Sequence, residues 1–339
     1  MNSVAIIGGG SFGTALADLL ARLGLQTHLY FRDAAQAIQT QESRYNQKYL
    51  PEHEIFPTIQ VSSDLVDSMQ KSEWLLFTVP SQTFRQVLIQ TRDHLCNQAQ
   101  KKPIVIASKG IEKDSLCTMA EVAVDVLGED WKDYIFALSG PSFAREIMLQ
   151  QPTAVTLAGT NEKLCDKLAR IFFCENFRVY TTHDMIGVEL GGALKNVMAV
   201  AAGAVIGLNL GDNSRAALIT RGLGEMTRMA LAKGADPMTL AGLSGLGDLI
   251  LTCTGSASRN RNFGELLGRG LTPEQAAEEI RQVVEGVDTS FSAWTLAQNL
   301  NVDVSIIRGV YEVIHEGLPV QQAFSRIVQR EPGKEFISP

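Results

Sequence analysis

VAIIGGGSFG, residues 4–13, joins an apolar run to a glycine-rich turn, and a helical pattern follows over residues 14–23. Gly8, Gly10 and Gly13 have the spacing Gly-x-Gly-x-x-Gly between an expected strand and an expected helix. The first glycine permits a tight turn, the second lets backbone approach a pyrophosphate, and the third lets the helix pack on the strand. The helix N-terminus then faces the anion. The stretch predicts a dinucleotide-binding turn; the alternative is a glycine-rich turn that binds nothing.

Short runs of strand-forming residues recur in the first half of the chain. They lie at residues 4–7, 27–31, 74–79, 104–107, 135–138, 154–157 and 177–180. Several are continuously apolar, which is typical of strands covered by helices on both faces. We therefore expect an α/β domain over residues 1–180, with a Rossmann-like, doubly wound, mostly parallel sheet.

The second half of the chain changes to helical periodicity. Polar side chains able to cap a helix stand at residues 181–184, before a long run of small and apolar residues. Farther on, residues 272–275 (TPEQ) combine an N-cap, a first-turn proline and a capping-box partner. Gly286 is the expected C-terminal stop of that helix. We expect an all-α domain over residues 181–339.

Composition disfavours several classes of function. The 339 residues are 45% hydrophobic and 20% charged, which suits packed cores rather than a disordered chain. A net charge of −7 disfavours a nucleic-acid binder, because such proteins need excess positive charge. The five cysteines have no metal-ligand spacing, so we expect reduced thiols and no metal.

No segment of the sequence predicts export or membrane insertion. The apolar N-terminal stretch lacks a basic start and is interrupted by glycines, unlike a signal peptide. The uncharged run between Lys195 and Asp212 is too short and too polar to span a bilayer. We expect a cytoplasmic protein without stable membrane insertion.

The end of the second expected strand, Phe31-Arg32-Asp33, is where a Rossmann fold meets the adenosine ribose of its cofactor. The Arg32 guanidinium can pair with a 2′-phosphate, so NADPH is favoured over NADH. Two alternatives stay open. Asp33 could accept hydrogen bonds from the ribose hydroxyls, or both side chains could lie in a solvated turn.

Lys195 stands in residues 187–200, a helical stretch rich in small and apolar residues. Such a helix is expected to be central, and burial lowers a lysine pKa because it disfavours the charged form. A lysine that titrates near neutrality suits general acid–base catalysis, so Lys195 is the predicted proton-transfer group. The alternative is a lysine that extends to solvent at a helix end.

Two further groups of polar residues follow expected strands at the ligand-binding edge of the sheet. Lys109 follows the run 104–107; the alternative is an ordinary surface lysine. Gly140 and Ser142 follow the run 135–138 and could contact a substrate or the nicotinamide carboxamide; the alternative is a simple proline turn.

The second half adds two more candidate sites. Asp248 stands between glycines and an apolar run, so it either caps a helix or orients Lys195 and a substrate hydroxyl. Residues 258–262 (SRNRN) concentrate hydrogen-bond donors in an acidic protein. They form either a phosphate clamp or a solvated basic loop.

The chain resembles the bacterial-type NAD(P)-dependent sn-glycerol-3-phosphate dehydrogenase family from about residue 4 to 330. The resemblance rests on the glycine-rich loop and, in order, on SKG at 108–110, SGPSFA at 139–144, GVELGGALKN at 187–196 and SRNR at 258–261. It implies reversible reduction of dihydroxyacetone phosphate, a phosphorylated triose, to sn-glycerol 3-phosphate by NADPH or NADH. That product supplies the glycerophospholipid backbone. A homodimer is a family-level expectation.

The resemblance also assigns roles to residues. Lys195 matches the catalytic proton donor and acceptor. The matched substrate contacts are Lys109, Gly140, Ser142, Lys195, Asp248, Ser258, Arg259 and Asn260. The cofactor contacts, loop glycines included, are Gly8, Gly10, Ser11, Phe12, Gly13, Arg32, Lys109, Ala144, Arg259, Val283 and Glu285. Two rival classes of protein fit the sequence less well: a methyltransferase has no evident need for Arg32, and a non-catalytic cofactor sensor could dispense with Lys195.

Overall fold

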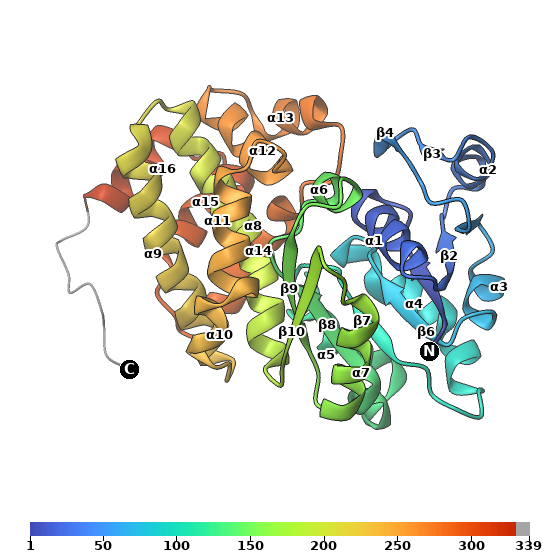
Figure 1. Ribbon diagram of the computed structural model, residues 1–339. Helices are drawn as coiled ribbons and strands as arrows, with labels where there is room; N and C mark the ends of the chain where they lie inside the picture. Colours follow the sequence, from blue (N-terminus) through green and yellow to red (C-terminus); the bar gives the residue numbers. More distant parts are fainter. Residues whose placement is uncertain (330–339) are drawn as a thin grey trace.

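The chain folds into a lobe built on a sheet and a lobe built of helices (Figure 1). A computed structural model describes residues 1–329, so residues 330–339 of the expected second domain lie outside the described residues. The strands are β1 (Ser3–Ile7), β2 (Gln26–Tyr30), β3 (Tyr45–Asn46), β4 (Leu50–Glu54), β5 (Gln60–Ser62), β6 (Trp74–Phe77), β7 (Ile104–Ile106), β8 (Ile135–Ser139), β9 (Thr153–Ala158) and β10 (Phe177–Thr182).

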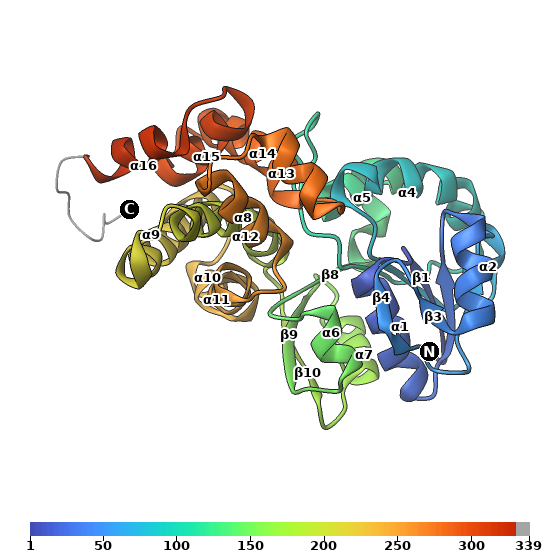
Figure 2. The same cartoon turned by 90° about the horizontal axis from the view of Figure 1, so that it is seen from above.

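Helices occur in both lobes, and α8 to α16 make up the second one (Figure 2). The helices that accompany the sheet are α1 (Ser11–Arg22), α2 (Ala34–Ser43), α3 (Leu65–Gln70), α4 (Ser81–Cys96), α5 (Met119–Leu127), the 3₁₀ helix η1 (Glu129–Tyr134), α6 (Ala144–Met148) and α7 (Glu162–Phe172). The others are α8 (Met185–Gly207), α9 (Gly211–Ala232), α10 (Pro237–Ala241), the π-helical η2 (Leu243–Gly247), α11 (Asp248–Thr254), α12 (Arg259–Gly268), α13 (Pro273–Ile280), α14 (Glu285–Asn299), α15 (Ser305–His315) and α16 (Val320–Val328).

The main sheet has the strand order β10-β9-β8-β7-β6-β1-β2-β5. Every neighbouring pair is parallel except β8 and β9. All seven strands expected from the sequence are present, and this confirms the mostly parallel α/β fold. Chain order reverses at β1, which lies between β2 and β6. Such a switch point is where open α/β sheets bind ligands, at the carboxyl ends of the strands.

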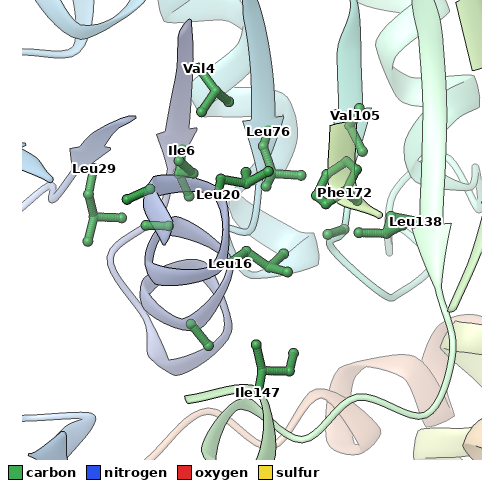
Figure 3. Close-up of a cluster of buried hydrophobic side chains, with 14 of the residues drawn as sticks. Val4, Ile6, Leu16, Leu20, Leu29, Leu76, Val105, Leu138, Ile147 and Phe172 are labelled. Atoms are coloured by element: carbon green, nitrogen blue, oxygen red, sulfur yellow. The ribbon is translucent and has the colours of Figure 1, made fainter. Parts of the chain in front are cut away.

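Alternate residues of β1 supply cores on both faces of the sheet. Val4 and Ile6 belong to one buried cluster, which Figure 3 shows gathered between α1 and the strands. Ala5 and Ile7 belong to another, together with residues of α4 and α5. All four side chains are fully buried, as the period of two along a strand between helical layers requires.

Helix α8 is the centre of the helical lobe and packs against α9, α11, α12 and α14. A Cβ atom at Gly203 would lie 1.9 Å from the Arg261 carbonyl oxygen, so glycine is what allows α8 and α12 to touch. By length and composition α8 is apolar enough to cross a membrane, but 83% of its most apolar window is buried inside the protein. Helix α8 is therefore a core helix of the second lobe.

Capping predictions in this lobe are confirmed except at one glycine. Asp184 caps α8 by accepting from the Gly187 amide, and Thr272 forms the expected capping box in α13. The assignment of Gly286 as the end of α13 is wrong, because α13 ends at Ile280 and Gly286 lies in the first turn of α14. A Cβ atom there would lie 2.8 Å from the Asn196 carbonyl oxygen. The glycine permits close packing of α14 on α8 rather than stopping a helix.

The chain passes from the first lobe to the second between Thr182 and Met185. Polar contacts also join the two lobes at other places. Three of them connect Glu189 with the Ala120 amide, Lys233 with Glu121, and Glu285 with Ser81. They hold the helical lobe against the N-terminal ends of α4 and α5.

Candidate active site

The glycine-rich turn has the geometry that the sequence predicts. Gly8 has a positive φ of 127°, and a Cβ atom at Gly13 would lie 2.0 Å from the Gly8 carbonyl oxygen. At Gly10 the corresponding position is open, with no heavy atom within 4 Å. No side chain caps the N-terminus of α1. The first amides of α1 therefore stay available to an anion, as pyrophosphate binding needs.

The end of β2 separates the roles of its two charged residues. Asp33 caps α2, and its Oδ1 accepts from the amides of Ala35 and Gln36 at 2.9 and 3.1 Å. Asp33 Oδ1 therefore already accepts two hydrogen bonds from the backbone of α2. Arg32 is exposed and forms no hydrogen bond or ion pair with the residues that the structure describes. Of the two, Arg32 is the side chain left for a ligand.

One carboxylate from the helical lobe joins two lysines from different parts of the chain. Lys195 Nζ, on α8, donates to Asp248 Oδ1 at 2.7 Å, and Lys109 Nζ, which follows β7, donates to Asp248 Oδ2 at 2.7 Å. Thr252 Oγ1, one turn after Asp248 in α11, lies 3.0 Å from Lys195 Nζ. The Asp248 side chain is only 2% exposed, so the ion pairs are shielded from water. The Asp248 side chain caps no helix and contacts Lys195 instead, and its role toward a substrate hydroxyl stays a prediction.

Burial sets the titration of this cluster. Burial lowers the pKa of Lys195 to about 8; Asp248 opposes that shift and the positive charge of Lys109 adds to it. Burial alone would raise the pKa of Asp248, but the two ammonium groups hold it below its ordinary value. The cluster thus contains a lysine that can hold or release a proton near neutral pH, together with a carboxylate that is ionised at that pH.

Lys109 connects this cluster with the glycine-rich turn. Its Nζ also donates to the Gly140 carbonyl at 3.2 Å and lies 5.8 Å from the centre of the Phe12 ring in α1. Ser142 Oγ donates to the same carbonyl at 2.9 Å. The segments after β7 and β8 therefore meet between the expected cofactor turn and Lys195. Ala144, two residues after Ser142, begins α6 and packs against the core of the first lobe.

The N-terminus of α12 brings together the expected phosphate contacts. Ser258 caps this helix through the Arg261 amide and is buried. The Asn260 amide nitrogen donates to Asn196 Oδ1 at 2.9 Å, and its oxygen accepts from the Gly286 amide at 2.9 Å. Arg259, in contrast, remains exposed. The cluster is the capped start of a helix rather than a loop, and its role as a phosphate clamp stays a prediction.

Glu285 links the helical lobe to the edge of the sheet. Its carboxylate accepts from the Ser81 hydroxyl at 2.6 Å and from the Ser81 amide at 3.3 Å, at the start of α4. Burial raises its pKa, while the Ser81 hydrogen bonds and the charge of Arg259 act the other way. Val283, two residues earlier, is half exposed. These residues lie where the second lobe faces the carboxyl ends of the strands.

Sequence reasoning missed three polar partners in this region. Thr252 and Asn196 have signals that could have found them, since one lies four residues after Asp248 and the other adjoins Lys195. Ser81 has no such signal, because its partner is more than 200 residues away. Within residues 1–329 no group of three His, Cys, Asp or Glu side chains could hold a metal ion, and the five cysteines are free.

A glycine-rich turn at the switch point of a mostly parallel sheet, combined with a buried lysine in the second lobe that titrates near neutrality, is typical of a nicotinamide-dinucleotide-dependent oxidoreductase.

Comparisons with known proteins identify the family. The family model described as the N-terminus of NAD-dependent glycerol-3-phosphate dehydrogenase matches residues 3–165, and the model of the C-terminus matches residues 184–325. Glycerol-3-phosphate dehydrogenase (NAD(P)+) of Geobacter sulfurreducens is 45% identical over 331 residues, covering 97% of each chain. The corresponding protein of Geobacter sp. strain M21 is 43% identical, covering 98% of this chain and 99% of its own.

A solved structure agrees with these sequence matches. The crystal structure of glycerol-3-phosphate dehydrogenase from Coxiella burnetii is similar with a TM-score of 0.92 and 38% identity, covering 97% of this chain and 99% of that one. The chain belongs to the NAD-dependent glycerol-3-phosphate dehydrogenase family. It is an NAD(P)-dependent oxidoreductase of glycerol 3-phosphate, as the resemblance implied. The methyltransferase alternative is wrong.

Proposed function

We propose that this enzyme reduces dihydroxyacetone phosphate to sn-glycerol 3-phosphate with Lys195 as the proton donor, and runs the reverse reaction with Lys195 as the acceptor. The observation that supports this role is the buried Lys195–Asp248–Lys109 cluster, with two N–O distances of 2.7 Å. A lysine with a pKa of about 8 is charged enough at neutral pH to give a proton to an alkoxide. It is also acidic enough to give that proton up readily.

Asp248 and Lys109 have supporting roles in this proposal. Asp248 neutralises one of the two lysine charges and orients Lys195 Nζ, so the cluster carries a net charge of about +1 toward the substrate. That remaining charge stabilises the negative charge that develops on the carbonyl oxygen during reduction. Because the cluster is buried, the stabilisation is stronger than it would be in water.

The dinucleotide fits the first lobe. The uncapped N-terminus of α1 and the open space at Gly10 would hold its pyrophosphate, with Ser11 and Phe12 in the first turn. When bound, the nicotinamide supplies or accepts the hydride. Arg32 would pair with the 2′-phosphate of NADPH, which is our basis for a preference over NADH. Ala144, Arg259, Val283 and Glu285 are proposed as the remaining cofactor contacts, with Lys109 shared between both ligands.

The substrate phosphate is assigned to the N-terminus of α12. Arg259 is exposed and can turn to an anion, and the buried caps Ser258 and Asn260 hold the helix terminus in place. Gly140 and Ser142 would contact the triose at the opposite edge. Binding energy from the phosphate would then position a carbonyl that reacts elsewhere.

The remaining assignments concern the whole chain. We propose that residues 1–180 form the NAD(P)-binding domain and residues 181–339 the substrate domain. We also propose a cytoplasmic enzyme, assembled as a homodimer, that binds no nucleic acid and does not insert stably into membranes. Its product would supply the glycerophospholipid backbone.

Nicotinamide absorbance tests the function directly. Protein mixed with NADPH and dihydroxyacetone phosphate should oxidise NADPH, and Lys195→Met should lower turnover by about two to four orders of magnitude. NADPH affinity of the variant, measured by fluorescence titration, should stay nearly unchanged. A folded variant that keeps turnover within a fewfold of the parent would remove Lys195 from the mechanism.

A further inference from the structure

A short hairpin that no sequence pattern indicated lies against the glycine-rich turn. Strands β3 and β4 pair in antiparallel fashion, and both views place them beside α1 (Figure 1, Figure 2). Asn46, at the end of β3, is completely buried although it is polar. Its Nδ2 donates to the Gly9 carbonyl at 2.9 Å and to Thr14 Oγ1 at 2.8 Å. One buried amide therefore joins the hairpin to both the turn and the helix of the cofactor loop.

The Gly9 carbonyl fixes the orientation of this amide, whose oxygen has a partner on the other side. Gln36 Nε2, on α2, donates to Asn46 Oδ1 at 3.2 Å. A carbonyl can only accept, so the nitrogen of the Asn46 amide must face Gly9 and the oxygen must face Gln36. A second contact of the hairpin, from Ser11 Oγ to the Tyr49 carbonyl, is longer at 3.4 Å. Asn46 is thus the main polar connection between hairpin and turn.

The carbonyl groups of the turn are all directed into the protein. The Gly8 carbonyl accepts from Thr78 Oγ1, the Gly9 carbonyl from Asn46, and the Gly10 carbonyl from the Thr14 amide. In a trans peptide the C=O and the following N–H point in opposite directions. Holding the Gly9 carbonyl on Asn46 therefore turns the Gly10 amide away from the buried Asn46 side chain.

We propose that Asn46 is a positioning residue for the dinucleotide: its buried amide holds the Gly9–Gly10 peptide so that the Gly10 N–H points at the pyrophosphate. The inference rests on the proposed cofactor site at the glycine-rich turn and extends it to a residue outside the motif. The pyrophosphate is common to NADH and NADPH. Loss of Asn46 therefore weakens both cofactors equally, unlike a change at Arg32.

The test compares three dinucleotide probes on three variants of the full-length enzyme. Asn46→Asp is isosteric and still accepts from Gln36 but cannot donate to the Gly9 carbonyl. Gln36→Ala leaves Asn46 in place and removes the hydrogen bond that its amide oxygen accepts. Gln47→Ala is the matched control, since Gln47 lies next to Asn46 in the same hairpin but is exposed. The probes are NADH, NADPH and ADP-ribose, which keeps the pyrophosphate without the nicotinamide.

Asn46→Asp should raise the Kd of all three probes about ten- to thirtyfold, the loss expected when one well-oriented donor to an anion is misdirected. Gln36→Ala should raise them by a smaller common factor, and Gln47→Ala should leave them unchanged. At saturating NADPH, kcat should stay within about twofold of the parent, because Lys195 is untouched. This KM-against-kcat separation distinguishes positioning of the cofactor from a general loss of structure.

Affinities of folded Asn46→Asp within twofold of the Gln47→Ala control would overturn the proposal, as would a loss confined to NADPH or to kcat. If Asn46→Asp does not fold, Gln36→Ala carries the test with the same criteria. Failure of the parent enzyme itself to bind any of the three probes would instead contradict the proposed cofactor site, so the two failures are distinguishable.

Discussion

Replacing Asp248 with asparagine separates the charge of the site from its shape. The substitution is isosteric and leaves Lys195 and Lys109 in place, but it removes the carboxylate that both lysines contact at 2.7 Å. Asp248 is the nearest group that raises the pKa of Lys195 against burial. Without it, two buried ammonium groups share a site that has no counter-charge. The neutral amine of Lys195 is then favoured.

The size of this effect follows from the distances. An opposite charge about 4 Å away is worth about 4 kcal/mol at an effective dielectric constant of about 20, and observed losses of such partners move a pKa by about 1 to 3 units. From its value of about 8, the pKa of Lys195 should therefore fall below neutrality. With a loss of about two units, roughly a tenth of the lysine would remain charged at pH 7, so reduction slows about tenfold from protonation alone.

The two reaction directions give opposite signs. Reduction needs the ammonium form and should decline in the parent enzyme as the pH rises through about 8, whereas oxidation of glycerol 3-phosphate needs the amine and should increase there. Asp248→Asn should move both limbs of kcat/KM, followed by nicotinamide absorbance, to lower pH. Asp212→Asn, at a side chain that is 86% exposed, is the matched control and should move neither. If the limbs of folded Asp248→Asn stay near pH 8, Asp248 does not hold the proton on Lys195.

Three further predictions address binding and stability. Arg259→Ala should lower kcat/KM far more for dihydroxyacetone phosphate than for unphosphorylated dihydroxyacetone; equal losses would remove Arg259 from the phosphate site. Arg32→Ala should raise the KM for NADPH about ten- to a hundredfold and barely change that for NADH; equal weakening would instead indicate stacking on adenine. Burial raises the pKa of Glu189 to about 7, so the folded state keeps its proton between about pH 4.5 and 7 while the unfolded state loses it. The unfolding free energy should therefore fall over this range in the parent but not in Glu189→Gln, a difference of up to about 3 kcal/mol at pH 8 that denaturant titrations at pH 5 and pH 8 would check.

Local patterns in the sequence were sufficient for seven strands of the main sheet, for the glycine-rich turn and for the burial of Lys195. Continuous apolar runs predict strands covered on both faces, and the glycine spacing predicts the turn at the end of β1. Lys195 is buried because the small residues around it in the sequence let other helices approach α8 on all sides. In each case the residues that determine the structure are close to one another in the sequence, where hydrophobic periodicity predicts secondary structure and burial.

The hairpin and Gly286 were not predictable in the same way. Strand β3 has two residues, and β4 (LPEHE) has a single buried apolar residue, so neither has an apolar pattern to detect. Gly286 comes after a well-capped helix, where a glycine that ends a helix is expected. Its absent side chain instead lets α14 approach Asn196 on α8. That contact spans 90 positions of sequence and depends on packing, so a glycine there has no local signature.

The distance between Lys195 and Asp248 is itself set by residues with no functional group. Asp248 follows η2, which lies directly on α8 because Gly191 has no side chain: a Cβ atom there would come within 2.6 Å of the Ser244 carbonyl oxygen. Gly245 is needed equally, since its Cβ would lie 2.1 Å from the Leu240 carbonyl oxygen. Any side chain at these glycines must push η2 and the start of α11 away from α8. The ion pair of 2.7 Å would then lengthen even though both charged residues remain. The glycines that precede the lysine and the aspartate thus influence the titration of the site, because Coulomb energy depends on the separation that they permit.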